Sequence, residues 1–110
     1  APPEMRLGEG MFVVRVVGRS MEPRIPDGSL NIFRAPVVGS RQGRIVLVKR
    51  PGGFEDSGGC TVKRYASIKR VTEEGWSHES IRMEPLNPEF PAFDLEPGDT
   101  VVAEWVRTLE

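Results

Sequence analysis

A serine and a lysine occupy positions where they could act as a nucleophile and a general base. Ser20 follows the apolar run Met11–Val17 and Gly18, a glycine that permits a sharp backbone turn. Backbone N–H groups beside a serine on such a turn suit an oxyanion hole. Lys63 lies inside the run 61–65, where strand alternation would bury one face. A lysine replaces histidine as base when it is neutral, which requires its pKa to fall from about 10.4 by roughly 3 units, or about 4 kcal/mol of desolvation. Taken singly, the two residues fit an ordinary turn serine and an exposed strand lysine better.

Other catalytic or metal-binding groups are sparse. His78 is the one histidine, so a Ser-His-Asp triad would have to use it, but its polar neighbours indicate a solvent-facing side chain. Cys60 follows two glycines, and nothing near it in the sequence would activate a thiol. Glu55 and Asp56 lie in a glycine-rich segment without metal-ligand spacing. A single histidine and a single cysteine also exclude a zinc site that needs several such ligands. We therefore expect neither a metal nor a cofactor.

The charge balance gives no sign of a nucleic-acid or membrane partner. The 15 basic and 16 acidic side chains leave a net charge of −1. Basic residues cluster between positions 41 and 70, but strand alternation sends neighbours to opposite faces, so a solvated face is expected rather than a nucleic-acid groove. The apolar runs are too short for a membrane span or a signal-peptide core. One cysteine cannot form an internal disulfide, which favours a reducing compartment and a cytoplasmic location.

The elements that must position Ser20 and Lys63 are strands. With 12 glycines and 10 prolines among 110 residues, the chain is too rich in turn residues for a helical bundle. β-branched and aromatic runs alternate with turn signals, which predicts a mostly β fold, a compact barrel-like or sandwich unit. We expect an irregular lead-in over residues 1–10, one domain over 11–110 and a loop over 51–59. The predicted strands are Met11–Val17, Leu30–Phe33, Arg44–Lys49, Thr61–Tyr65 with a continuation to Val71, Trp76–Met83 and Thr100–Arg107.

Several segments together resemble the LexA-type self-cleaving repressors and related Ser-Lys peptidases. VVGRSMEPRIPDGSL, which contains Ser20, resembles the family's nucleophile motif, and CTVKRY resembles the strand that carries its lysine. QGRIVLVKR, IRMEPLNPEFPAF and GDTVVAEWVR are similar to three further segments of the family. Each motif is weak alone. Their joint order, over about residues 11–107, is specific.

The resemblance implies a fold of strongly curved sheets, which is often dimeric, and a serine peptidase that cuts one specific peptide bond. Ser20 would attack the carbonyl, and neutral Lys63 would take its proton and pass it to the leaving amine. By the same analogy the backbone N–H groups of Arg19 and Ser20 would hold the oxyanion, and Met21 would pack beside the site. The partners implied are a peptide or protein substrate and a second copy of the chain, without direct nucleic-acid contact from this domain.

The sequence departs from the family pattern in ways that affect the expected substrate. Arg19 stands where aspartate is common, and the stretch between Ser20 and Lys63 is longer than in compact members. No Ala-Gly or Cys-Gly bond occurs among the residues before Ser20, so the target bond is expected in a longer parent regulator, LexA-like or phage-repressor-like, or in a partner. Type I signal peptidases share a Ser-Met-x-Pro motif, but their membrane anchor and GDNR-type segment are not found here. The alternative is a non-catalytic dimerisation and regulatory module whose interface is the apolar last strand, 100–107.

Overall fold

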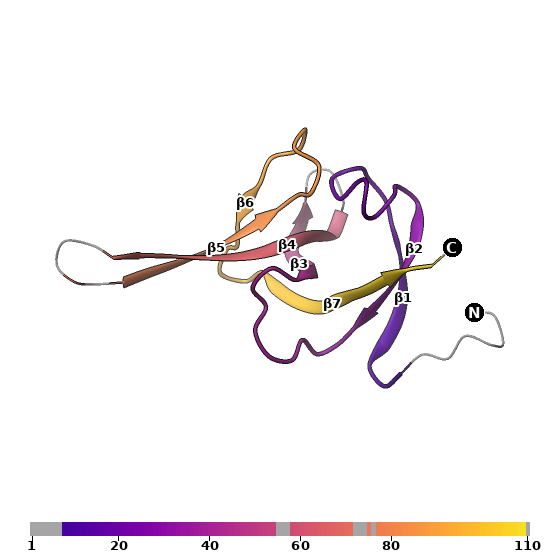
Figure 1. Ribbon diagram of the computed structural model, residues 1–110, viewed down its shortest axis with the longest axis horizontal. Helices are drawn as coiled ribbons and strands as arrows, with labels where there is room; N and C mark the ends of the chain where they lie inside the picture. The colour runs from indigo at the N-terminus through magenta and orange to yellow at the C-terminus, as the bar shows by residue number, and fades with distance from the viewer. Residues whose placement is uncertain (1–7, 55–57, 72–74, 76, 110) are drawn as a thin grey trace.

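Seven strands form one antiparallel sheet in the part of the chain that the computed structural model describes, residues 8–54, 58–71, 75 and 77–109 (Figure 1). The order across the sheet is β1-β2-β7-β3-β4-β5-β6, so the chain's last strand pairs with β2 on one side and β3 on the other. The strands are β1 (Met11–Val16), β2 (Ser29–Arg34), β3 (Ile45–Phe54), β4 (Gly58–Val71), β5 (Ser77–Glu84), β6 (Phe93–Asp94) and β7 (Thr100–Thr108).

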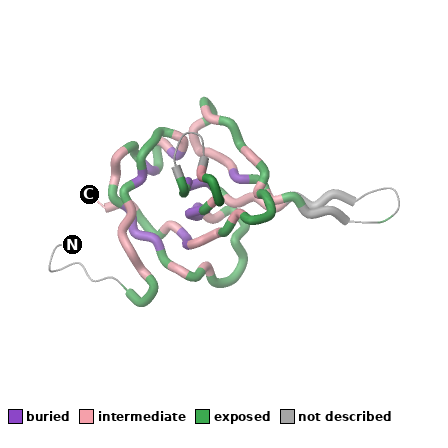
Figure 2. The backbone as a smooth tube through the Cα atoms, turned by 180° about the vertical axis from the view of Figure 1, so that it is seen from behind, coloured by how far each residue is buried: buried purple, intermediate pink, exposed green. Residues whose placement is uncertain are grey.

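The mostly β prediction is confirmed, but the sheet does not close into a barrel. β1 and β6 lie at the two ends of the strand order and no pairing joins them among the described residues. The sheet is strongly curved, and the hairpin of β4 and β5 extends away from its rounded part (Figure 1). Figure 2 shows that the buried segments gather inside this rounded part, where the connection between β1 and β2 also lies.

The loop predicted over residues 51–59 is wrong in part, because strand pairing continues into it. β3 runs on to Phe54, which pairs with Gly58 at the start of β4. The register shifts between Lys49 and Phe54, and Gly52 and Gly53 in this stretch have φ values of 84° and 81°. A backbone conformation that favours glycine lets the strand bulge without ending. The short strand β6 was not predicted, since two residues after a proline-rich segment carry no alternation signal.

The first four residues of β3, 45–48, are buried on both faces, which explains their unbroken apolar run. Ile45 and Leu47 belong to one hydrophobic cluster, together with Phe33 of β2. Val46 and Val48 point the other way, into a second cluster with Met83 of β5. Because paired residues of an antiparallel ladder share a face, Lys63 opposite Val46 and Thr61 opposite Val48 lie on the side of the second cluster. The strand that carries Lys63 is therefore positioned by β3.

Candidate active site

Ser20 lies in the connection between β1 and β2, which a set of backbone contacts holds in a fixed shape. Gly18 has a φ of 112°, and its N–H donates to Asp27 Oδ1 at 2.8 Å. The Gly28 N–H donates to the Val16 carbonyl at 2.7 Å and closes the base of the connection. The glycine makes the sharp turn possible, and the Asp27 contact keeps the turn in place. Ser20 thus stands on a braced turn directly after a strand, as its sequence context predicts.

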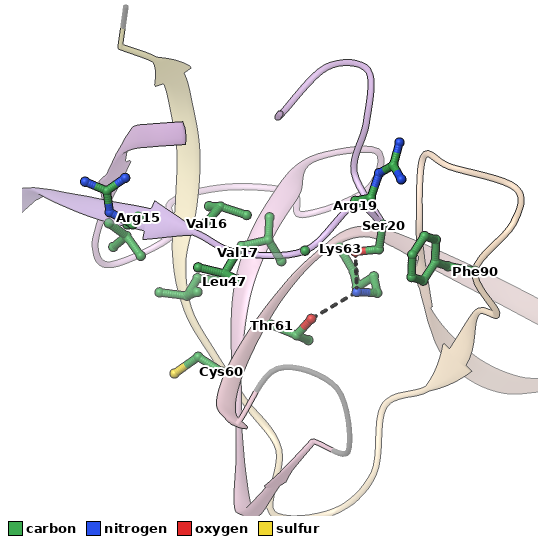
Figure 3. Close-up of a pocket in the computed structure, with 13 residues that line it drawn as sticks. Arg15, Val16, Val17, Arg19, Ser20, Leu47, Cys60, Thr61, Lys63 and Phe90 are labelled. Carbon is green, nitrogen blue, oxygen red and sulfur yellow. Dashed lines mark hydrogen bonds between the residues drawn. The ribbon is translucent and has the colours of Figure 1, made fainter. Parts of the chain in front are cut away.

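Lys63 reaches Ser20 from the neighbouring strand β4. Its Nζ donates to Ser20 Oγ at 3.0 Å and to Thr61 Oγ1 at 2.9 Å (Figure 3). The residue is 5% exposed and Thr61 is 7% exposed, so the amine lies among protein atoms rather than in bulk water. Residues 61 and 63 share a strand face, which brings the threonine hydroxyl alongside the amine. The structure thus brings together the two side chains whose types suggest a nucleophile and a base.

A cavity of about 600 Å³ opens beside this pair. Its wall is formed by the end of β1 and the turn after it, by β3 and by the first half of β4, with one ring from the segment before β6 (Figure 3). The ionisable side chains of the Asp, Glu, His, Lys and Arg type among its described lining residues are all basic, namely Arg15, Arg19 and Lys63. Most of the remaining lining is apolar, from Val14, Val16, Val17, Leu47, Val62 and Phe90. A segment of peptide could therefore place an apolar side chain next to Ser20.

The backbone N–H groups of Arg19 and Ser20 are the ones that the resemblance implies for an oxyanion hole. Within the described part of the chain, no acceptor takes the N–H of Arg19 or of Ser20. The Arg19 side chain is turned away into solvent and donates to Glu22 Oε1 at 3.0 Å. The pKa of Glu22 is held below its ordinary value, first by the Asp27 N–H that it accepts and then by Arg19. The arginine that replaces a common aspartate is thus bound to an anionic partner on the same turn.

Met21 does not line the cavity among the described residues, although it was expected to pack beside the site. It is 1% exposed and belongs to the hydrophobic cluster beneath the turn, with Ile25. The Ile25 N–H donates to the Met21 carbonyl at 3.0 Å, so one short turn carries both side chains into the core. Met21 anchors the turn from below.

Asn87 contacts the turn from a distant part of the chain and was not singled out from the sequence. Its backbone N–H donates to the Ser20 carbonyl at 2.9 Å, and its Nδ2 donates to the Arg19 carbonyl at 3.0 Å. The one signal in the sequence is its place inside the segment IRMEPLNPEFPAF, which resembles the peptidase family. Composition and periodicity give no means of finding a contact 68 positions away.

Of the other candidate groups, the structure describes His78 and Cys60. The β4–β5 register sets His78 opposite Arg70, seven positions along β4 from Lys63. At about 3.3 Å per residue this separation is roughly 23 Å, too far for His78 to act as the base for Ser20. Cys60 is exposed and lines the cavity, but its sulfur points away from Lys63 (Figure 3). Glu55 and Asp56 lie outside the described residues.

Four arginines in or next to the middle strands are paired with carboxylates. Arg50 binds Asp99 at 2.8 Å and Arg64 binds Glu84 at 3.0 Å. Arg34 and Arg44 both bind Glu104, which is buried in β7. The described residues contain no group of three or more metal-ligating side chains that could hold an ion, and none of their segments is a helix long and apolar enough to span a bilayer.

Most of the chain matches one family of known proteins. Residues 2–106 match the family model described as Peptidase S24-like. No curated protein matches the sequence. The match covers the turn with Ser20, the strand with Lys63 and the segment with Asn87.

Proposed function

The chain belongs to the Peptidase S24-like family, and from this membership we propose that it is a serine peptidase domain in which Ser20 and Lys63 hydrolyse a specific peptide bond. One observation carries the proposal: a buried lysine amine lies 3.0 Å from a serine hydroxyl at the edge of a cavity. A nucleophile within hydrogen-bond reach of its base is the arrangement that nucleophilic catalysis requires.

In the proposed mechanism the neutral amine of Lys63 takes the proton from Ser20 Oγ as the oxygen attacks the substrate carbonyl carbon. Burial supports the neutral form, because removal from water disfavours the charged ammonium. The Thr61 hydroxyl keeps the amine directed toward Ser20. The carbonyl oxygen becomes an oxyanion, which the N–H groups of Arg19 and Ser20 stabilise. Lys63 then donates its proton to the leaving amine, and a water molecule, deprotonated by the same lysine, hydrolyses the acyl-enzyme.

The proposed substrate is a peptide segment in a longer parent chain or in a partner protein. The mostly apolar cavity favours an apolar side chain beside the bond that is cut. By resemblance, the parent would be a LexA-like or phage-repressor-like regulator that is controlled by cleavage, and the domain would form a homodimer.

The alternative, a non-catalytic dimerisation module, uses the same fold without cleavage. Such a module has no need of an amine buried against a hydroxyl, and a buried amine costs stability unless the site uses it. The position of Lys63 therefore favours the peptidase.

The test is cleavage of a peptide library, with new termini identified by mass spectrometry. Ser20→Ala should abolish the cuts, and Lys63→Met should slow them by about 100-fold to 10,000-fold, the usual contribution of a general base. Ser80→Ala and Lys49→Met, which change exposed residues outside the cavity, are the matched controls and should cleave like the wild type. Cuts that persist in Ser20→Ala, or a folded wild type that cuts nothing, would overturn the proposal in favour of the module.

A further inference from the structure

Asn87, in the segment between β5 and β6, binds the nucleophile turn through two hydrogen bonds. The two carbonyl groups that Asn87 binds, those of Arg19 and Ser20, are consecutive in the chain. The backbone N–H of Asn87 donates to the Ser20 carbonyl, and its side-chain amide donates to the Arg19 carbonyl. Both contacts lie on the backbone of the turn, so they act on its orientation and not on the reacting side chains.

Asn87 is itself fixed by its own segment. The Glu89 N–H donates to Asn87 Oδ1 at 3.0 Å, and the Phe90 N–H donates to the Asn87 carbonyl at 3.1 Å. The amide therefore has an N–H donor at its oxygen and a carbonyl acceptor at its nitrogen, and this pattern sets which end faces Arg19. Since Phe90 also lines the cavity, the segment that holds the turn contributes to the substrate wall as well.

The geometry of a trans peptide converts these contacts into control of the oxyanion donors. The C=O of Arg19 and the N–H of Ser20 belong to one planar unit and point in opposite directions. Two donors converge on the Arg19 oxygen, Asn87 Nδ2 and the Glu22 N–H at 3.2 Å. They hold that oxygen on one side of the turn, which leaves the Ser20 N–H on the other side. Donation to the carbonyl also polarises the peptide and strengthens its N–H as a donor.

We propose that Asn87 is a positioning residue that orients the Ser20 N–H toward the oxyanion of the transition state. This inference rests on the proposed peptidase function. Asn87 touches neither substrate nor reacting atoms, so its effect belongs to the rate of the chemical step. If the Ser20 N–H already points toward the position of the oxyanion, it does not have to reorient as charge develops on the substrate oxygen.

The experiment compares Asn87→Asp and Asn87→Ala with the wild type in steady-state peptide cleavage. Asn87→Asp keeps an oxygen for the Glu89 N–H but loses the donor to Arg19. Both variants should lower kcat by about 10-fold to 100-fold, approaching the loss of an oxyanion donor, while KM changes by less than about 3-fold. Pro88→Ala, an exposed neighbour, is the control and should keep both constants. If Asn87→Asp retains the wild-type kcat, Asn87 only shapes its own segment and the proposal is refuted.

A second measurement separates this inference from the proposed function. The NMR order parameter of the Ser20 amide should be near 0.85 in the wild type and in Pro88→Ala, and should fall below about 0.6 in Asn87→Asp. An unchanged value would overturn the positioning role whatever the activity. A wild type that cuts no peptide, with the order parameter still falling in the variant, would refute the peptidase and leave Asn87 as an orienting residue of a non-catalytic turn.

Discussion

Replacing Glu104 by glutamine tests whether the buried carboxylate in β7 stabilises the middle of the sheet by binding two arginines. Glu104 is 6% exposed, and its two oxygens accept from arginines on both sides. Arg34 at the end of β2 donates to Oε1 at 3.2 and 2.8 Å, and Arg44, just before β3, donates to Oε2. Glutamine keeps the shape of the side chain but removes the charge that both guanidinium groups face.

The expected cost lies between that of a surface pair and that of a fully buried pair. The arginine side chains are 47% and 39% exposed, so water still solvates them after the substitution. Breaking a buried pair costs about 3–5 kcal/mol and an exposed pair contributes at most about 1 kcal/mol, so we expect a loss of roughly 2 kcal/mol in the free energy of unfolding. Glu84→Gln is the matched control, since its pair with Arg64 is 29% and 45% exposed, and it should cost less than about 1 kcal/mol.

The difference between wild type and Glu104→Gln should also depend on pH. The pKa of Glu104 is lowered in the folded protein, mainly by the hydrogen bond from Arg34. Its stabilising contribution is therefore complete above the ordinary glutamate pKa near 4.3 and is lost as the pH falls through the lowered pKa. Urea unfolding followed by circular dichroism at pH 7, 4.5 and 3 should show the gap closing in acid. A gap that stays constant with pH, or a cost no larger than that of Glu84→Gln, would refute the reasoning.

Three further changes give distinct outcomes. Met21→Ala should reduce the free energy of unfolding by about 2–5 kcal/mol in urea titrations, because it leaves a cavity at a fully buried site. Leu30→Ala is the control and should cost much less, since Leu30 is 39% exposed. Equal losses would contradict the anchoring role of Met21. Lys63→Arg should lower peptide cleavage at least about 100-fold with no recovery at high pH, since a guanidinium stays protonated; recovery at pH 10 would argue against a lysine base. The pKa of Asp99 is lowered chiefly by its hydrogen bond from Arg50, so its contribution is present above the ordinary aspartate pKa and disappears as the pH falls through the lowered one. In Asp99→Asn the free energy of unfolding, measured in urea titrations, should fall less steeply below about pH 4 than in the wild type. An equal fall in both proteins would exclude this contribution.

Most of the strands could be predicted because each of these is a run of β-branched and apolar residues that is bounded by turn residues in the sequence itself. The β-branched run of β1 and the apolar run of β3 lie within one residue of their predicted starts. Ser20 and Lys63 were found through residue type and resemblance, and the structure places the Lys63 Nζ 3.0 Å from the Ser20 Oγ. The extension of β3 to Phe54 was not predicted, because glycine and proline indicate a loop when the pairing partner of a segment is unknown.

Contacts between distant segments could not be predicted in the same way. Glu104 occupies one position in an alternating strand, and its neighbours in the sequence do not indicate that it will form ion pairs with two arginines. Asn87 similarly gains its role from a turn far back in the sequence. Such roles depend on the sheet order, which pairs β7 with β2 and β3.

The place of β7 in that order has a consequence for biosynthesis. Residues 100–108 leave the ribosome last among the strands, yet they fill the gap between β2 and β3. Until they emerge, β2 and β3 each present an unpaired edge, and neither Arg34 nor Arg44 has its shared carboxylate. The nascent chain can form the β1–β2 and β3–β4–β5 hairpins locally, but the two halves join only when β7 inserts. The two halves of the sheet therefore join through non-local pairing, which makes folding slow for a chain of this size.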